Sequence, residues 1–263
     1  MSDYQITLIG QEHSNQQYGF YIPELSLLFE CYVDPPFSSR FILISHGHNI
    51  QCQNLNQRIS GLPQTIICPK SIVETLNNYL EAQGIRSDLI TFQGTLEGNQ
   101  IDLDNPYFYL KCYNLDHTTA CLGYGLFCRR RRPKQQLLKS MLNKQQIIEM
   151  RQQGIKLTEI HDEPVLIYLS DTTIKVFEQY PDILSYRYIV INCPYCVTQT
   201  KKSGIEQELA ETEKQMSWKD LFPIIQSNPD CCFIIFQSPS KSQFWQSDGV
   251  EQKIKLDNVI FVH

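Results

Sequence analysis

The sequence has no long uninterrupted hydrophobic run. Among its 263 residues there is no window of about 18 apolar, uncharged residues, which excludes a membrane-spanning helix. The opening MSDYQITLIG has neither the apolar core of a secretion signal nor an Arg-rich amphipathic presequence, so we expect no cleaved leader. Without a leader, the expected compartment stays open between the cytosol and the mitochondrion.

Positive charge is not in excess either. Lys and Arg number 23 against 28 Asp and Glu, which gives a formal net charge of -5 and argues against a dedicated, sequence-independent nucleic-acid binder. Any nucleic-acid-binding face must therefore be local. The hydrophobic fraction of 42% predicts a globular protein with a sizeable core and excludes a disordered or collagen-like chain.

Ten cysteines are present, mostly at the ends of apolar runs. Because the chain has no secretion signal, we expect them to be reduced and buried rather than paired in disulfides. Cys193 and Cys196 have the spacing of a redox pair. A redox fold would place such a pair after an early strand, so we expect no redox role for these two.

Short apolar runs predict two successive sets of strands, each followed by a helix. Strands are expected over 4–10, 19–22, 25–33, 41–45, 89–93, 108–115, 123–128, 164–170, 188–193, 231–236 and 259–262. Helices are expected from Ser71, with Glu74 completing a capping box, to Gly84, over about 134–153, and from Ser217. No linker divides the chain, so the sequence predicts one α/β domain over 1–263, with two sheets and helices outside them.

Three histidines and one aspartate follow apolar strands. His46 and His48 lie in SHGH directly after FILI, His117 lies in LDHTT after FYLKCYNL, and Asp171 lies in SDTT after VLIYLS. Two histidines at i and i+2 past a strand end can aim at one point, and imidazole is the commonest zinc ligand. The pattern indicates a metal site at one edge of the sheet pair.

The order and spacing of ISHGH, GLPQTIICPKSIVETL, LDHTTACLGYGL and LIYLSDTT resemble the short-form tRNase Z enzymes of the metallo-β-lactamase superfamily. The resemblance implies an αββα four-layer sandwich with two zinc ions at its edge, which cuts the 3′ trailer from precursor tRNA with a metal-bound hydroxide. It also implies that His46, His48, His117 and Asp171 correspond to the ligands of the first metal.

The first departure from that family lies beside the histidine pair. The family motif is His-x-His-x-Asp-His, whereas this chain has Ile50 in place of the catalytic Asp and Gln51 in place of a second-metal His. Isoleucine can neither ligate a metal nor accept a proton, and a neutral amide is a poor zinc ligand. The second metal and the general base are therefore expected to be lost.

The second departure comes from counting histidines. After Asp171 only His263 remains. The family's late proton-donor His therefore falls near Ser217, and its late ligand His falls at Phe236, or at Gln237 if the register slips by one.

These departures predict a non-catalytic, tRNase Z-like protein with no catalytic residue, which serves as a structural or binding subunit of a larger assembly. We expect either no cofactor or at most one zinc ion, held by the four residues above. The alternative is a weak, one-metal zinc-dependent hydrolase of RNA or another phosphodiester that uses the same four ligands. Protein partners are expected, with RNA as the alternative partner.

The chain has a single basic run, RRRRPK. It could bind the phosphates of an RNA, or an acidic protein or lipid surface; otherwise it is a solvated turn before the long helix. Four adjacent like charges repel one another unless something neutralises them. We therefore predict that Arg129, Arg130, Arg131 and Arg132 form a partner-binding surface.

Overall fold

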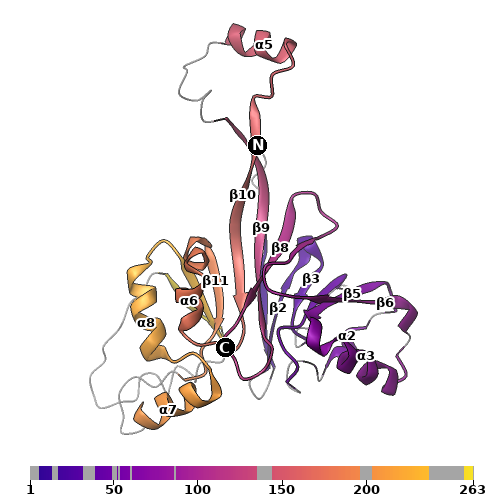
Figure 1. The fold of residues 1–263 in the computed structure, drawn as a ribbon, viewed down its shortest axis with the longest axis vertical. Coiled ribbons are helices and arrows are strands. Elements are labelled where there is room, and N and C mark those ends of the chain that lie inside the picture. The colour runs from indigo at the N-terminus through magenta and orange to yellow at the C-terminus, as the bar shows by residue number, and fades with distance from the viewer. Residues whose placement is uncertain are drawn as a thin grey trace.

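Two β-sheets lie face to face at the centre of the computed structural model, and helices cover their outer faces (Figure 1). The structure describes residues 6–13, 17–31, 39–48, 52, 54–59, 61–85, 87–134, 144–195, 203–236 and 258–262. None of the helices in these ranges combines the length and the apolar character that crossing a membrane requires.

The first sheet has six strands in sequence order. They are β1 (Ile9–His13), β2 (Gln17–Ile22), β3 (Leu27–Phe29), β4 (Phe41–Leu43), β5 (Gln64–Pro69) and β6 (Ile90–Thr95). The first three pair antiparallel and the remaining pairs are parallel. Its helical segments are η1 (Pro23–Leu25), α2 (Leu55–Arg58), η2 (Lys70–Ile72), α3 (Val73–Ala82) and η3 (Ser87–Leu89).

The second sheet has seven strands in the order β13-β12-β11-β10-β9-β8-β7. They are β7 (Gln100–Asp102), β8 (Phe108–Asn114), β9 (Leu122–Pro133), β10 (Thr158–Leu169), β11 (Tyr188–Asn192), β12 (Cys232–Phe236) and β13 (Val259–Phe261). The strands from β7 to β10 pair antiparallel, and those from β10 to β13 pair parallel. Its helical segments are α5 (Lys144–Gln152), α6 (Lys175–Gln179), η4 (Pro181–Ser185), α7 (Ser203–Glu213) and α8 (Trp218–Ser227).

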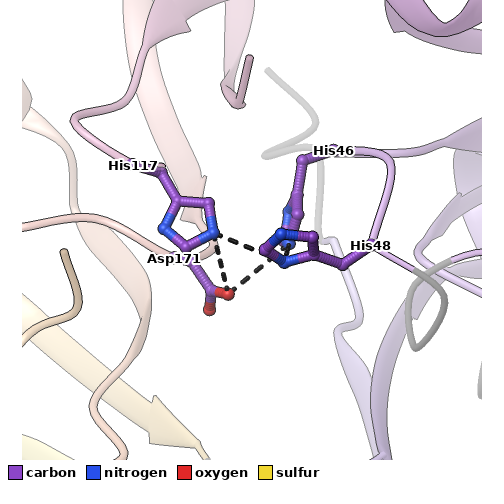
Figure 2. A group of neighbouring side chains, drawn as sticks. All are labelled: His46, His48, His117 and Asp171. Atoms are coloured by element: carbon purple, nitrogen blue, oxygen red, sulfur yellow. Dashed lines mark hydrogen bonds and ion pairs between the residues drawn. The ribbon is translucent and has the colours of Figure 1, made fainter. Parts of the chain in front are cut away.

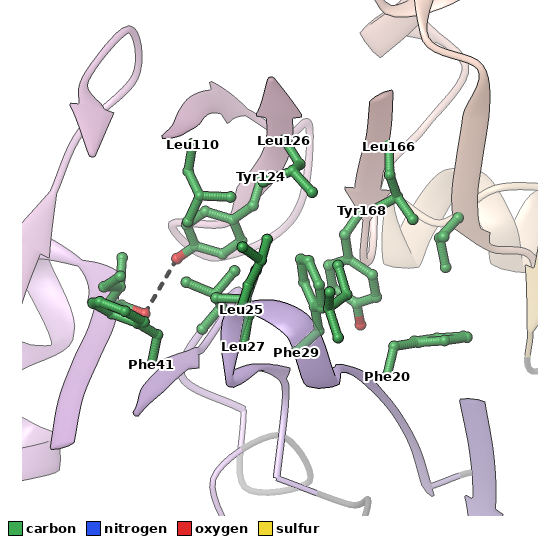
Figure 3. Close-up of a cluster of buried hydrophobic side chains, with 14 of the residues drawn as sticks. Phe20, Leu25, Leu27, Phe29, Phe41, Leu110, Tyr124, Leu126, Leu166 and Tyr168 are labelled. Atoms are coloured by element: carbon green, nitrogen blue, oxygen red, sulfur yellow. Dashed lines mark hydrogen bonds between the residues drawn. The ribbon is translucent and has the colours of Figure 1, made fainter. Parts of the chain in front are cut away.

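Alternate side chains of the central strands enter different cores. In β4, Phe41 and Leu43 face the second sheet, whereas Ile42 packs on the outer side with Leu76 and Leu80 of α3. Figure 3 shows the inner core, in which Phe20, Phe29 and Tyr168 pack between the sheets. Strands buried on both faces are continuous apolar runs, which is why the sequence pattern predicts them well. The predicted αββα class is confirmed.

The helix starts predicted at Ser71 and Ser217 have different outcomes. Helix α3 begins at Val73, after the 3₁₀ turn η2, and no side chain caps it, so the capping box predicted from Ser71 is wrong. Gly84 ends that helix as predicted, with a φ of 70° that favours glycine. The prediction for α8 is confirmed, because the Asp220 backbone N–H donates to the Ser217 Oγ over 3.2 Å.

The helix predicted over about 134–153 is confirmed in its later part by α5, whereas the turn expected at the four arginines before it is wrong. Strand β9 continues through the four arginines and pairs antiparallel with β10, so that the two strands form a ribbon that projects from the sheets and carries α5 at its far end (Figure 1). The Lys134 N–H still donates to the Leu157 carbonyl over 3.1 Å. Residues 135–143, the first part of the predicted helix, lie outside the described residues.

The cysteine prediction is confirmed for the nine cysteines that the structure describes. All nine are free thiols, and most are buried. Cys193 follows β11 and is fully buried, while Cys196 lies outside the described residues. The predicted absence of a redox role for this pair stays a prediction.

Candidate metal centre

Four side chains converge at one edge of the sheet pair (Figure 2). His46 and His48 follow β4 of the first sheet, whereas His117 follows β8 and Asp171 follows β10 of the second. Their ligand atoms all lie within 4.8 Å of one another. The structure therefore brings together every metal ligand that the sequence predicts.

The spacing of the donor atoms fits a zinc ion. His46 Nε2 lies 3.1 Å from His48 Nδ1, and His48 Nδ1 lies 3.5 Å from His117 Nε2. Asp171 Oδ2 lies 3.5 Å from His46 Nε2 and 3.6 Å from His117 Nε2. Because zinc bonds to nitrogen and oxygen at about 2.0–2.2 Å, tetrahedral geometry separates neighbouring donors by about 3.3–3.6 Å. The donors are thus already near their liganding separations.

Hydrogen bonds orient the two buried imidazoles. His117 Nδ1 lies 3.2 Å from the Lys214 carbonyl, which can only accept, so this nitrogen carries the proton and Nε2 offers its lone pair to the centre. His46 Nδ1 lies 2.8 Å from Ser45 Oγ, and its Nε2 likewise faces the centre. Such second partners fix the tautomer of a metal-binding histidine.

The carboxylate of Asp171 is held by two amides. Asn192 at the end of β11 donates to Oδ1, and Gln215 after α7 donates to Oδ2 over 3.3 Å. Asp171 is only 5% exposed, so these bonds replace most of the water that a carboxylate would otherwise bind. Together the two amides orient the Asp171 carboxylate so that its Oδ2 faces His46 and His117.

Burial keeps His46 neutral. The pKa of His46 is lowered to about 4, chiefly by desolvation; Asp171 opposes the shift, and the nearby His117 and His48 add to it. At neutral pH the ring is therefore in the deprotonated form that binds a metal. His48 is only partly buried and forms the solvent side of the centre.

The backbone that leads to the histidine pair is anchored by both sheets. The Leu122 N–H donates to the Ser45 carbonyl over 2.9 Å, and the Tyr124 hydroxyl donates to the Ile44 carbonyl over 2.7 Å. Ser45 N–H also donates to the buried carboxyl of Glu30 over 3.2 Å. This anchoring fixes the direction in which His46 points.

The residues that the predicted resemblance aligns with the family's late histidines have other roles here. Phe236, at the end of β12, is 2% exposed and stacks on Tyr168 with a ring-centroid distance of 5.7 Å, so it belongs to the inner core. Ser217 caps α8, and its hydroxyl also donates to Asp220 Oδ2 over 2.7 Å. Ile50, Gln51 and Gln237 lie outside the described residues. Within the part of the chain that the structure describes, the four residues above are the one cluster that could hold a metal.

The predicted arginine surface lies at the other end of β10. Arg129, Arg130 and Arg132 are on β9 beside the start of β10, whereas Asp171 follows the end of β10. Arg129 pairs with Asp102 at 2.7 Å, and both Arg130 and Arg132 pair with Glu163. Two of the chain's own carboxylates thus pair with three of the four arginines, and the partner-binding role of the run stays a prediction.

The sequence interpretation missed the residues that support the ligands: Glu30, Asn192, Lys214 and Gln215. A signal existed for Asn192 alone, because it ends the apolar strand beside the one that precedes Asp171. The carboxyl ends of neighbouring parallel strands meet at one edge of a sheet. No local sequence pattern identifies Glu30, Lys214 or Gln215 as supporting residues.

Comparison with solved structures supports the fold. Similar structures include the metallo-β-lactamase fold protein YhfI from Bacillus subtilis, with a TM-score of 0.56 and 11% identity over 89% of this chain and 86% of that one. Zn²⁺-bound PqqB from Methylobacterium extorquens has a TM-score of 0.56 and 9% identity over 98% of this chain and 84% of that one. Human short-form tRNase Z has a TM-score of 0.51 and 9% identity over 98% and 89%.

No protein-family model matches the sequence, and no curated protein matches it. At such low identity the structural likeness defines the fold alone. The chain has the metallo-β-lactamase fold, and its finer resemblance to short-form tRNase Z stays a prediction.

Proposed function

We propose that this chain is a single-zinc, non-hydrolytic protein of the metallo-β-lactamase fold, which acts as a binding subunit of a larger assembly. The observation that carries the proposal is the convergence of three imidazoles and one carboxylate within 4.8 Å of one another. Zinc sites with four protein ligands are structural, whereas catalytic sites keep one position for water. His46, His48, His117 and Asp171 complete such a set.

A zinc ion bound there would supply a cross-link between the two sheets. The ligands on this chain come from both: His48 follows a strand of the first sheet, while His117 and Asp171 follow strands of the second. The supporting bonds from Lys214 and Asn192 hold donors in place before any ion binds. A pre-oriented donor set of this kind suits tight, static binding.

The loss of catalysis is supported by what stands at the remaining family positions. Phe236 packs in the core and Ser217 caps a helix, so neither can bind a metal or transfer a proton in the family's way. Ile50 and Gln51 in the sequence remove a base and a ligand. Two-metal hydrolysis stabilises the attacking and leaving oxygens together, and losing several members of such a unit removes most of the rate.

Metal analysis tests the first half of the proposal. Protein purified without added zinc is expected to hold one zinc per chain, and His117→Ala is expected to lose it. His161→Ala is the matched control, because this histidine lies on the ribbon, where its side chain is 42% exposed and pairs with Glu159. Folded wild-type protein that holds no zinc would contradict the proposal.

An activity assay tests the second half. In Zn²⁺ or Mn²⁺ we expect precursor tRNA to be cleaved at least about a hundredfold more slowly than by an intact tRNase Z, or not at all. Loss of a general base alone lowers the rate by about 10²- to 10⁴-fold. Cleavage within that margin that disappears in His48→Ala would instead support the one-metal hydrolase.

A further inference from the structure

The ribbon formed by β9 and β10 has two unlike faces. Side chains alternate along each strand, and Arg131 pairs with Ile160 while Arg132 pairs with Glu159. One face, here called the Arg131 face, therefore carries Arg129, Arg131, Thr158, Ile160 and Asp162, with Lys156 beyond the start of β10. The opposite face, here called the Glu163 face, carries Arg130, Arg132, Glu159, His161 and Glu163.

The Glu163 face is neutralised by its own residues. Arg130 Nε lies 2.9 Å from the Glu163 carboxylate, which also binds Arg132. His161 Nε2 lies 3.0 Å from Glu159 Oε1. Each basic group on this face thus has a carboxylate, so the face offers little attraction to a charged partner.

The Arg131 face is different. It contains a hollow of about 480 Å³ lined by Arg131, Lys156, Thr158, Glu159 and Ile160. The single carboxylate in that lining is Glu159, which belongs to the Glu163 face and already binds His161. Among the described residues, neither Arg131 nor Lys156 has an ion pair. Ile160 lies directly opposite Arg131 and is 63% exposed.

The far end of the ribbon is also uncovered. None of the described side chains of α5 is buried, and Ile148 and Ile155 are 46% and 42% exposed. A helix of nine residues is unstable in water unless an apolar face packs against something. Exposed apolar residues grouped on a projecting element mark a protein interaction site.

We propose that the Arg131 face binds an acidic protein segment that carries an apolar side chain. Two carboxylates of the segment would pair with Arg131 and Lys156, and its apolar side chain would cover Ile160. Arginine suits this role because its planar donors match a carboxylate. RNA fits less well, because residues 129–134 and 144–164, which form the projecting part of the ribbon and α5, include no Phe, Tyr or Trp on which a base could stack.

Two labelled probes test the proposal on the full chain. One is a twelve-residue peptide in which Asp and Glu alternate with Leu, and the other is a twelve-nucleotide single-stranded RNA. We expect the peptide to bind more tightly than the RNA, and Arg131→Glu to weaken peptide binding at least about tenfold. Ile160→Ser is expected to weaken it several-fold at every salt concentration, because that contact is apolar.

Arg132→Glu is the matched control, since it makes the same charge change in the same run on the Glu163 face. It is expected to change peptide affinity less than about twofold, and thermal melting checks that each variant is folded. Three results would overturn the proposal: no peptide binding, equal losses in Arg131→Glu and Arg132→Glu, or tighter binding of RNA that depends on Arg131. None of these outcomes depends on the zinc content, so a failure here leaves the metal proposal standing.

Discussion

At the scale of single residues, Glu30 is the most unusual group near the centre. Its φ of 59° is in the left-handed region, and its side chain is 2% exposed. One carboxyl oxygen accepts from Ser45 N–H, while the other has no hydrogen-bond partner among the described residues. Burial raises the pKa of Glu30 to about 8, so the folded state favours the protonated form.

This shift predicts how stability changes with pH. Between the ordinary pKa of 4.5 and the folded pKa of about 8, the folded state binds more protons than the unfolded state, so stability falls as pH rises. The lowered pKa of His46 has the opposite effect, but only below pH 6.5. Zinc-free protein should therefore melt at lower temperature at pH 8 than at pH 6.5, and Glu30→Gln should flatten this dependence.

Thermal unfolding in the two buffers measures the effect. Glu74→Gln is the control, because that residue lies exposed in the first turn of α3. An equal slope in wild type and Glu30→Gln would show that Glu30 is ionised in the folded protein.

Asn192 gives a second prediction at this scale. Its amide donates to Asp171, and removing such a partner typically costs 10- to 100-fold in metal affinity. We expect Asn192→Ala to lower zinc affinity by about that factor in competition with a chelator, with the fold retained. Asn77→Ala on α3 is the matched control, and equal affinities in the two variants would show that Asp171 needs no such support.

The ligands could be predicted from the sequence, but their supports could not. His46, His48 and His117 stand out because the chain has only six histidines and these three follow apolar strands. Gln215 is one of many glutamines, and it reaches Asp171 because Lys214 before it takes a φ of 50°. That turn depends on packing between segments distant in sequence, which no local pattern records.

At the scale of elements, β9 can pack closely against Tyr186 because it has a glycine, Gly125, at the point of contact. A Cβ on Gly125 would lie 2.0 Å from the Tyr186 hydroxyl oxygen. That hydroxyl lies 3.0 Å from the Tyr113 hydroxyl in the outer core of the second sheet. Gly125 therefore permits the close contact between β9 and the segment that leads into β11.

Gly125→Ala should destabilise the protein by about 1–3 kcal/mol, because the added methyl group would force either β9 or the Tyr186 side chain to shift. Chemical denaturation measures the change. In a double-mutant cycle, Tyr186→Phe should relieve part of the loss, since it removes the atom nearest the new methyl group. Strictly additive effects would mean that the strand moves freely and that no clash occurs.

The strands were predictable because most of them are apolar runs buried on both faces, as Ile189, Val190 and Ile191 of β11 illustrate. The outer half of β9 could not be predicted as a strand, because four consecutive arginines show no alternation of apolar and polar residues. Its extended form comes from pairing with β10, which lies more than twenty residues further along the chain. The local sequence therefore predicts a turn at the four arginines, whereas pairing with the distant strand β10 makes this segment extended.

At the scale of the whole molecule, the metal centre and the ribbon occupy opposite ends of the second sheet. The centre joins the two sheets, whereas none of the described residues from 129 to 164 belongs to any of the three buried clusters. Folding and metal binding are therefore expected to be separable from partner binding.

Shortening the ribbon tests this separation. Replacing residues 132–159 by Asn-Gly would join Arg131 directly to Ile160, its partner in the register, through a two-residue turn that favours a hairpin. We expect the shortened protein to keep its zinc content and to melt within about 4 °C of wild type, because about 1 kcal/mol shifts the melting temperature by roughly 2–4 °C in a chain of this size. Binding of the acidic peptide should be lost, since Lys156, Thr158 and α5 are removed. Loss of zinc or of cooperative unfolding would contradict the separation and show that the ribbon supports the core.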